Sequence, residues 1–344
     1  EEEGKKKMKT TSIIIATTLL LALATVALAN DLFYQNEFVQ WQKQHKKMYA
    51  SPLEFKKRLS IFTENHKEIQ SINAKKLSWT AGLNEYSDMT WEEFKNHFNL
   101  APQECSATKG SFKSNADVEA SLPPSFDWRY FGVVNPVKNQ GSCGSCWAFS
   151  ATAAQEVHHA INTGKLYSLA EQQLVDCAPA PSHGCHGGLP SYAFEYFKAV
   201  GGQTTEDQYP YTARDGTCKF QQSTAVVQTK GSYNITEGDE ADIATQIVKT
   251  TAVSVAYQVV SDFRHYKAGV YSSTECKSDS QSVNHAVLAV GYNQTATGEP
   301  FWIIRNSWGP DWGMGGYFWM AKYRDPKHPL NMCGIATCAS YPQM

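Results

Sequence analysis

The stretch that decides the fold covers residues 140–147 and reads Gln-Gly-Ser-Cys-Gly-Ser-Cys-Trp. The residues that follow, 146–162, predict a helix that begins at Cys146 and is ended by Gly164. A cysteine at a helix N-terminus meets unpaired backbone N–H groups and the positive end of the helix dipole, which both favour the thiolate over the thiol. Cys146 is therefore a candidate reactive thiol.

Composition and charge exclude some classes of partner. The chain has 344 residues, of which 42% are hydrophobic, and this is enough for one large domain or two mid-sized lobes. A formal net charge of −2 and a pI near 6.6 give no electrostatic reason to expect nucleic acid or an anionic membrane as a partner. We therefore expect small or peptidic partners and no cofactor.

An apolar run near the start predicts entry into the secretory route. Residues 13–28 are apolar, four lysines precede them, and residues 27–29 read Ala-Leu-Ala, a cleavage pattern of small residues. The run is short for a membrane span, which needs about 20 apolar residues. A signal peptide is therefore the preferred interpretation and a single-pass anchor is the alternative. Residues 1–7 precede Met8, where an initiator would stand, and are excluded from the reasoning about the fold.

The number of cysteines is odd. In a secreted chain cysteines are expected to pair, and four disulfides would leave one thiol free. That thiol is either an unpaired buried cysteine or the reactive Cys146. The nine cysteines stand at positions 105, 143, 146, 177, 185, 218, 276, 333 and 338.

Composition also divides the chain into two parts. Residues 31–100 are charged, rich in predicted helix and free of cysteine, whereas the chain after Leu122 is rich in cysteine, glycine and tryptophan. Between them, residues 101–121 form a polar stretch typical of an exposed, cleavable linker. In the second part, helix gives way to short apolar runs, typical of strands, over residues 251–257, 285–292, 301–305 and 316–321. A helical lobe followed by a β lobe, an α+β fold, is the simplest architecture.

A periodic stripe marks one helix of the first part. Six residues three or four positions apart fall on one face of a helix, since each residue turns about 100°. They are Glu54, Arg58, Phe62, Asn65, Ile69 and Asn73. Taken alone, the stripe indicates only a helix that packs on a neighbour. Residues 82–88 follow it and read Gly-Leu-Asn-Glu-Tyr-Ser-Asp.

Together these motifs resemble the papain-type cysteine peptidases. Residues 143–147, Cys-Gly-Ser-Cys-Trp, are similar to the signature of papain and the cathepsins. The stripe resembles, at all six positions, the propeptide helix of cathepsin-L-like and cathepsin-H-like peptidases, and residues 82–88 resemble their second propeptide motif, with Tyr86 in place of phenylalanine. The resemblance implies a papain-like two-lobed fold, with a helical left lobe and a β-barrel-like right lobe, preceded by a small helical inhibitory propeptide.

The resemblance assigns three side chains to catalysis. Cys146 would be the nucleophile, with its pKa lowered far below the usual thiol value of about 8.5 by the helix start and a neighbouring imidazolium. His285, 139 residues downstream at the start of a predicted strand, would act as base and acid. Asn306 would accept the imidazole N–H and fix the ring, and Trp308 would shield that hydrogen bond from water.

Other positions are implied in substrate binding. Gln140 resembles the glutamine of the oxyanion hole, whose side-chain N–H would act together with the backbone N–H of Cys146. Gly144 and Gly188 match glycines that contact the substrate, and the backbone of Gly188 would grip an extended peptide. A pair of glycines alone would indicate only a tight turn.

The resemblance also implies three disulfides: Cys143–Cys185, Cys177–Cys218 and Cys276–Cys333. Because Cys185 is committed to one of them, the histidines beside it, His183 and His186, are not expected to hold a metal. Cys105 and Cys338 are left over.

Residues 101–108 resemble the mini-chain of cathepsin H, an octapeptide cut from the propeptide and kept on the mature enzyme by a disulfide. A Cys105–Cys338 bridge fits that arrangement. The new carboxylate of Thr108 would then meet the free amine of a substrate, and the octapeptide would fill the cleft beyond the first substrate residue. This predicts an aminopeptidase with residual endopeptidase activity. Glu104 departs from the pattern, because cathepsin H commonly has a glycosylated asparagine there.

Two other functions stay open. The first is a cathepsin-L-like endopeptidase whose linker only resembles the mini-chain. The second is a catalytically inactive papain homologue that acts as a binding or storage protein. The complete set Gln140, Cys146, His285 and Asn306 speaks against the second.

The expected organisation is a leader and signal peptide over residues 1–29, a propeptide over 30–100, the mini-chain over 101–108, an excised linker over 109–121 and the peptidase domain over 122–344. Acid is expected to protonate Glu85 and Asp88 and so permit self-cleavage. Asn234 and Asn293 begin glycosylation acceptors.

The resemblance also implies partners and a destination. The expected partners are peptide and protein substrates, the propeptide as an intramolecular inhibitor, and inhibitors of the cystatin type. We expect a monomer without a membrane anchor. Its destination would be a lysosome or an equivalent acidic vacuole, or the outside of the cell.

Overall fold

The computed structural model describes residues 28–103, 122–323 and 330–344. Most of the expected signal peptide, Cys105, Thr108 and the linker 109–121 lie outside the described residues. The chain divides into two compact units. The first holds the chain up to Glu68 together with Ser87–Met89, and the second holds Ile69–Tyr86 and Thr90–Met344.

The first unit is helical and has an aromatic core. Residues 28–44 are helical, and α2 (Pro52–Ala74) begins in this unit and ends in the other. Phe38 is fully buried, with its ring 5.7 Å from Trp41 and 5.2 Å from Phe62. Phe62 belongs to the predicted stripe, so the apolar side of that stripe faces a core.

The polar members of the stripe hold residues 87–89. Asn65 donates hydrogen bonds of 2.8 Å to the carbonyls of Ser87 and Met89. Arg58 donates to the carbonyl of Asp88 at 2.9 Å, and the carboxylate of Asp88 accepts from the Tyr49 hydroxyl at 3.0 Å. The stripe therefore organises the loop that contains the expected second propeptide motif.

The second unit contains the sheet. In the part of the chain that the structure describes, its strands are hydrogen-bonded in the order β1-β5-β8-β7-β6-β4-β9-β3, and β2 pairs with β6. All pairs are antiparallel except β5 with β8. The path is open and ends at β1 and β3 rather than closing into a barrel. The strands are β1 (Trp79–Ala81), β2 (Phe126–Asp127), β3 (Gly231–Asn234), β4 (Val253–Tyr257), β5 (Tyr266–Tyr271), β6 (His285–Gln294), β7 (Pro300–Arg305), β8 (Tyr317–Ala321) and β9 (Ser340–Gln343).

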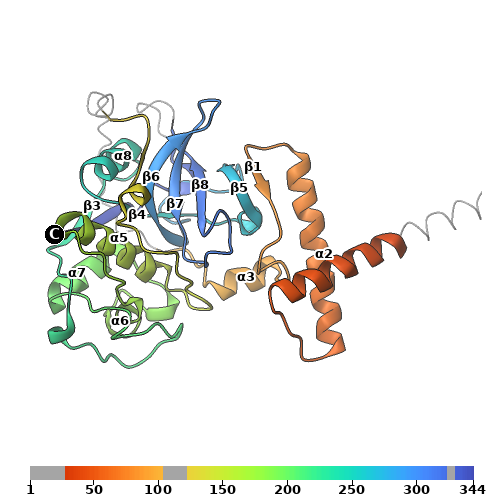
Figure 1. The fold of residues 1–344 in the computed structure, drawn as a ribbon, viewed down its shortest axis with the longest axis horizontal. Coiled ribbons are helices and arrows are strands. Elements are labelled where there is room, and N and C mark those ends of the chain that lie inside the picture. Colours follow the sequence, from red (N-terminus) through yellow and green to blue (C-terminus); the bar gives the residue numbers. More distant parts are fainter. Residues whose placement is uncertain (1–27, 104–121, 324–329) are drawn as a thin grey trace, which may run out of the picture. The chain divides into compact units, whose positions relative to one another are not determined.

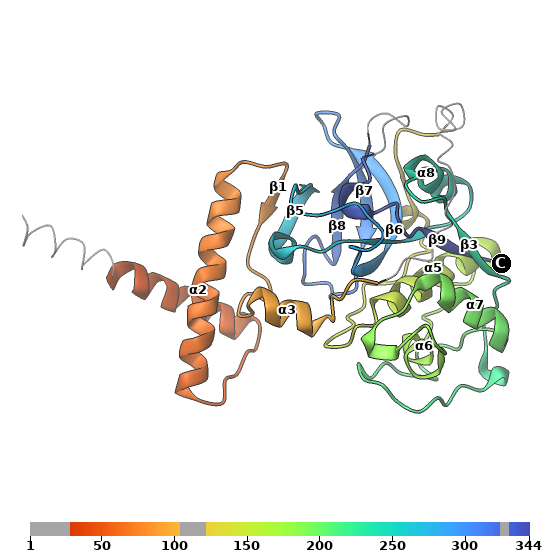
Figure 2. The ribbon, with the colours of Figure 1, turned by 180° about the vertical axis from the view of Figure 1, so that it is seen from behind.

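Helices gather beside this sheet. Figure 1 shows α5, α6 and α7 together on one side of the unit, with α5 next to β4 and β6. The α-helices are α3 (Trp91–His97), α5 (Cys146–Thr163), α6 (Glu171–Cys177), α7 (Pro190–Val200) and α8 (Glu240–Lys249). Short 3-10 helices are η1 (Trp128–Phe131), η2 (Gly184–His186), η3 (Gln222–Thr224), η4 (Ser261–His265) and η5 (Met332–Gly334). The view from behind shows β3 and β9 beside α7 (Figure 2). A helical half and a strand half are therefore present, as the α+β prediction requires.

The central helix α5 is buried on nearly all sides because it packs on α6, α7, β6 and β9. It begins at Cys146 and ends before Gly164, which adopts a left-handed conformation with φ 73° and donates its N–H to Ala160. This conformation suits glycine, as the sequence indicates. On the facing side, β6 is central in the sheet, and its first eight residues are buried. A strand with neighbours on both edges and cover on both faces reads as a continuous apolar run.

The sequence patterns do not predict two features of the sheet. The four predicted strands lie within two residues of β4, β6, β7 and β8, but β3, β5 and β9 have no clear alternation. The segment before the expected mature domain also adds a strand, because β1 pairs with β5 from Trp79↔Gly269 to Ala81↔Tyr266. The alternation buried, exposed, buried in β1 is only three residues long, which is too short to predict a strand.

Candidate active site

The thiol of Cys146 lies where the helical half meets the strand half. Cys146 is the first residue of α5, is 9% exposed, and belongs to a buried cluster with Ala256, Val283 and Ala286. Ala286 is the second residue of β6 and follows His285. The fold therefore brings the helix start and the start of β6 together across 139 residues of sequence.

The imidazole of His285 is oriented by an amide. Its Nε2 lies 2.8 Å from Oδ1 of Asn306, the residue that follows β7. The same Oδ1 accepts the backbone N–H of Ser307 at 2.8 Å, so this oxygen is the acceptor and Nε2 carries a proton. In the neutral ring Nδ1 is then the basic nitrogen, and it has no hydrogen-bond partner among the described residues. Nδ1 is thus the nitrogen available to the thiol.

A tryptophan covers this hydrogen bond. The ring of Trp308 stacks on His285 with centroids 4.7 Å apart and 27° between the planes, and Trp308 is fully buried. Exclusion of water lowers the local dielectric and strengthens the bond between imidazole and amide.

The side chain of Gln140 is also fixed in orientation. It is fully buried, accepts a hydrogen bond from the Ser307 hydroxyl on Oε1 at 2.7 Å, and donates from Nε2 to the carbonyl of Cys143 at 2.9 Å. An amide nitrogen carries two protons, so one remains for another acceptor. Ser307 therefore joins the asparagine loop to the glutamine.

Two expected substrate-binding glycines stand at points of close approach. A Cβ on Gly144 would collide with the carbonyl of Cys185 and come 2.7 Å from Asn99. A Cβ on Gly188 would come 2.7 Å from the ring of Trp147. Glycine is needed at both positions because the neighbouring groups leave no room for a side chain.

Residues 94–103 of the N-terminal segment cover the site. The ring of Phe98 stacks on Trp308 at 4.7 Å, and Phe94 meets the same indole edge to face at 5.2 Å. Asn99 donates to the carbonyl of Cys185 at 3.3 Å. Gln103 donates its backbone N–H to Val283 at 3.0 Å. The segment thus contacts both halves on either side of Cys146.

Burial sets the direction in which the pKa of each member of the pair is shifted. Burial raises the pKa of the Cys146 thiol by more than the backbone N–H groups at the start of α5 and at Ala286 lower it. Burial also lowers the pKa of His285 to about 4, although the hydrogen bond to Asn306 acts in the opposite direction. The expected ionised pair is therefore not the state that the covered site favours. Without water, the helix start alone does not compensate the cost of burying a thiolate.

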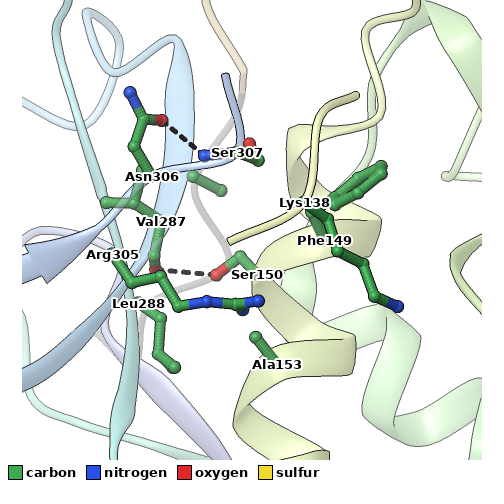
Figure 3. Close-up of a pocket in the computed structure, with 10 residues that line it drawn as sticks. Lys138, Phe149, Ser150, Ala153, Val287, Leu288, Arg305, Asn306 and Ser307 are labelled. Carbon is green, nitrogen blue, oxygen red and sulfur yellow. Dashed lines mark hydrogen bonds between the residues drawn. The ribbon is translucent and has the colours of Figure 1, made fainter. Parts of the chain in front are cut away.

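A small pocket lies between α5 and the sheet, beside Asn306 and Ser307 (Figure 3). Ser150 of α5 donates to the carbonyl of Val287 in β6 at 2.7 Å, and this bond joins the two halves. Figure 3 shows Arg305 reaching from β7 toward α5, below the hydrogen bond between Asn306 and Ser307. The pocket is lined by backbone and positioning groups and is too small for a peptide.

Three disulfides frame the helical half and the strand half. They are Cys143–Cys185, Cys177–Cys218 and Cys276–Cys333, and Cys146 is a free, buried thiol. Cys338 is also disulfide-bonded and packs against the cluster that contains Cys146.

The described residues contain no group of three or more His, Cys, Asp or Glu side chains that could hold a metal ion. His186 instead lies 3.6 Å from the carboxylate of Asp215, and both side chains are largely exposed. His158, on the helix of the thiol, is buried and pairs with the carbonyl of Pro342 at 2.7 Å, which is a packing role.

Sequence motifs did not identify every residue of the site. Ser307, Phe98 and Val283 contact site residues, and of these only Ser307 lies inside a recognised motif, next to Asn306. A serine beside an expected catalytic asparagine was the available signal. Nothing in the pattern around Phe98 indicates that it packs on a tryptophan 210 residues away.

A buried thiol at a helix start, an imidazole fixed by an amide, and an N-terminal segment that covers both define the precursor of a cysteine peptidase. Residues 122–343 match the family described as papain family cysteine protease, and residues 38–94 match the cathepsin propeptide inhibitor domain (I29). The chain therefore belongs to the papain family of cysteine proteases.

Individual relatives align with this chain over most of their length. Cysteine proteinase 3 of Solanum lycopersicum is 51% identical over 307 residues, which cover 89% of this chain and 83% of the relative. Pro-cathepsin H of Bos taurus is 47% identical over 324 residues, 93% of each chain. Among solved structures, a recombinant stem bromelain precursor has a TM-score of 0.81 at 35% identity and covers 90% of this chain and 99% of that chain. These relatives support a cysteine peptidase.

Proposed function

We propose that Cys146 is the nucleophile, His285 the base and acid, and Asn306 the group that orients the imidazole. The hydrogen bond of 2.8 Å from His285 to Asn306, which leaves Nδ1 available, supports these roles most directly. The thiolate attacks the carbonyl carbon of the peptide bond, and the imidazolium gives its proton to the leaving amine. Water, deprotonated by His285, then hydrolyses the thioester and restores the thiol.

The charge on the carbonyl oxygen is held by two donors in this proposal. One is the unused N–H of Gln140, and the other is the backbone N–H of Cys146. Donors of this kind act because they are already in place in a water-poor site, and the loss of one costs about 3–4 kcal/mol in comparable enzymes. Gly144 and Gly188 would hold the extended substrate beside them.

We further propose that the mature enzyme is mainly an aminopeptidase controlled by residues 101–108. Gln103 belongs to this octapeptide, and it already lies across the site. Its backbone bonds to Val283, and its side chain lies so close to Gly187 that a Cβ there would come within 2.7 Å of it. Pro-cathepsin H of Bos taurus and of Medicago truncatula are among the relatives.

A tether for the octapeptide is also available. Cys338 is disulfide-bonded, and the three described bridges together with the free Cys146 account for seven of the other eight cysteines. Cys105 is the partner that we propose. The carboxylate of Thr108 would then select a protonated substrate amine, and Glu104 would add a second negative charge nearby.

Substrates that differ only in their amino terminus test this proposal. The enzyme should hydrolyse a free-amine aminoacyl substrate faster than its N-blocked form. The variant Cys338→Ser, which cannot hold the octapeptide, should reverse that preference while it keeps endopeptidase activity. Preference for the blocked form in the unaltered enzyme would favour the cathepsin-L-like endopeptidase instead.

Acid is the proposed trigger for processing. The Asp88 carboxylate accepts from Tyr49 and lies 3.5 Å from the ammonium of Lys47, and a neutral side chain at this position would lose the ion pair. Glu85 would act with it. The variant Asp88→Asn should process itself at a higher pH than the wild type, whereas the exposed control Asp207→Asn should not. An unchanged pH of processing in Asp88→Asn would exclude this trigger.

The proposal also covers the cellular destination of the protein, its glycans and its inhibitors. No helix among the described residues is long and apolar enough to cross a membrane. We propose the secretory route to a lysosome or an equivalent vacuole, or to the cell exterior, with glycans at Asn234 and Asn293. We also propose a monomer that is open to cystatin-type inhibitors after its propeptide is removed. Intact mass of the mature, non-reduced protein tests the glycans and the octapeptide together.

A further inference from the structure

One tyrosine outside every recognised motif contacts both ends of the loop that leads to the thiol. The hydroxyl of Tyr211 donates to the carbonyl of Gln140 at 2.8 Å. The same oxygen lies 2.6 Å from Oγ of Ser145. A phenol has one proton, and Gln140 accepts it, so the Ser145 hydroxyl is the donor in the second bond. One oxygen therefore joins residues 140 and 145.

These two residues flank the proposed oxyanion donors. Gln140 carries the side-chain N–H, and Ser145 directly precedes Cys146, whose backbone N–H is the second donor. Ser145 is the N-cap residue of α5, but its side chain does not cap the helix, because it is used in the bond to Tyr211. Serine is a common N-cap residue, but the hydroxyl of Ser145 bonds to Tyr211 instead of capping the helix.

Tyr211 is itself held from several sides. Its ring meets Phe149, one turn into α5, edge to face at 4.8 Å. Its backbone N–H donates to the carboxylate of Glu206 at 2.8 Å. That carboxylate lies 3.6 Å from the ammonium of Lys138, two residues before Gln140. The tyrosine and the segment that leads to Gln140 are therefore anchored to the same half-buried ion pair.

We infer that Tyr211 is a positioning residue that holds the two oxyanion donors at a fixed separation. The inference rests on the proposed roles of Gln140 and Cys146. Preorganised donors stabilise the transition state only if they need not move when charge develops, and small displacements of catalytic groups are costly. Among the described residues, no hydrogen bond or ring contact joins Tyr211 to the thiol or the imidazole, so it acts through the loop.

The variant Tyr211→Phe removes the hydroxyl and keeps the ring on Phe149. In the enzyme matured from the full chain, we expect kcat on a peptide substrate to fall about tenfold, with KM changed less than about twofold, because the loss is confined to the transition state. A peptide aldehyde, whose adduct with the thiol places an oxygen at the same donors, should bind about tenfold more weakly. The rate of alkylation of Cys146 by iodoacetamide, which forms no oxyanion, should stay within about twofold.

A matched control lies two residues away. The hydroxyl of Tyr209 donates to Asp176 at 2.8 Å in the same half of the unit, without contact to Gln140 or Ser145. The variant Tyr209→Phe should leave kcat and aldehyde binding unchanged. If Tyr211→Phe does not yield folded protein, Ser145→Ala can be used instead, because it removes one of the two bonds. It should lower kcat about threefold, with KM changed less than about twofold.

Failure of the inference is separable from failure of the proposed oxyanion hole. The variant Gln140→Ala should lower kcat about 100-fold, and an unchanged kcat would reject the hole itself. If Gln140→Ala is impaired but Tyr211→Phe keeps kcat and aldehyde binding within twofold of the wild type, the positioning role is wrong. An equal loss of alkylation rate in Tyr211→Phe would likewise overturn it, since the thiol would then be the group affected.

Discussion

Two sets of buried ionisable groups in the second unit respond to burial in different ways. At the Cys146–His285 pair, burial dominates and both groups are driven toward their neutral forms. At Lys138, burial also opposes the charge, but the carboxylates of Glu171 and Glu156 outweigh it and the pKa of the lysine is raised. The contrast shows that a buried group stays charged only where an opposite charge is fixed beside it.

The lysine cluster is defined by four side chains. The ammonium of Lys138 lies 2.8 Å from Glu171, 3.6 Å from Glu206 and 3.7 Å from Glu156. Three carboxylates exceed one ammonium, so burial and the neighbouring carboxylates raise the pKa of Glu171 to about 8, against the effect of the lysine. We expect this cluster to stabilise the folded state and the catalytic pair to be required for activity.

Removal of the thiol should give the largest effect, and it should fall on activity alone. The variant Cys146→Ala should lose about four orders of magnitude or more in peptide hydrolysis. Its free energy of unfolding should change by only about 1 kcal/mol, because a neutral partner leaves no orphaned charge. Hydrolysis assays and urea unfolding of the precursor measure both. A loss above about 3 kcal/mol would mean that the covered pair is charged after all.

Removal of the lysine should give the opposite result. In the inactive Cys146→Ala background, Lys138→Met should lower the free energy of unfolding by about 3–5 kcal/mol, since it leaves carboxylates buried without a partner. The exposed lysine at position 165 supplies the control, and Lys165→Met should change stability by less than about 0.5 kcal/mol. Equal losses of unfolding free energy in Lys138→Met and Lys165→Met would contradict the claim that the lysine cluster stabilises the fold.

The smallest effect concerns the dependence of stability on pH. Because the folded pKa of Glu171 lies above its unfolded value, the folded state binds more protons between about pH 4.5 and 8, so the contribution of this group is largest at low pH and is lost as the pH rises. Glu171→Gln should remove this slope. Urea unfolding at several pH values measures it, and an unchanged slope would assign the titration to another group.

Sequence patterns predicted the parts of the site that are encoded locally. The end of α5 before Gly164 and the start of β6 at His285 follow from a glycine stop and an apolar run, and the motif around Asn306 supplied the third side chain. The stripe on α2 was recognised because a helix repeats its contacts every three or four residues. Each of these signals lies within a short window of sequence.

Contacts between distant segments could not be predicted in this way. Lys138 and Glu171 are 33 residues apart, and Tyr211 lies 71 residues after Gln140, with no periodicity that relates them. The sequence motifs also did not predict the protonation state of the Cys146–His285 pair. A helix start and an imidazole predict a thiolate, but burial of the thiol reverses that expectation for the precursor.

The measurement that tests this account most directly is the pH titration of the thiol before and after maturation. Ultraviolet absorbance of the thiolate, taken as the difference between the wild type and Cys146→Ser, reports ionisation without a reagent that must enter the site. We predict no thiolate signal from Cys146 at about pH 5 in the precursor and a clear signal in the mature enzyme at the same pH. The same thiolate titration in both forms would contradict the claim that the propeptide segment 94–100 holds the pair neutral.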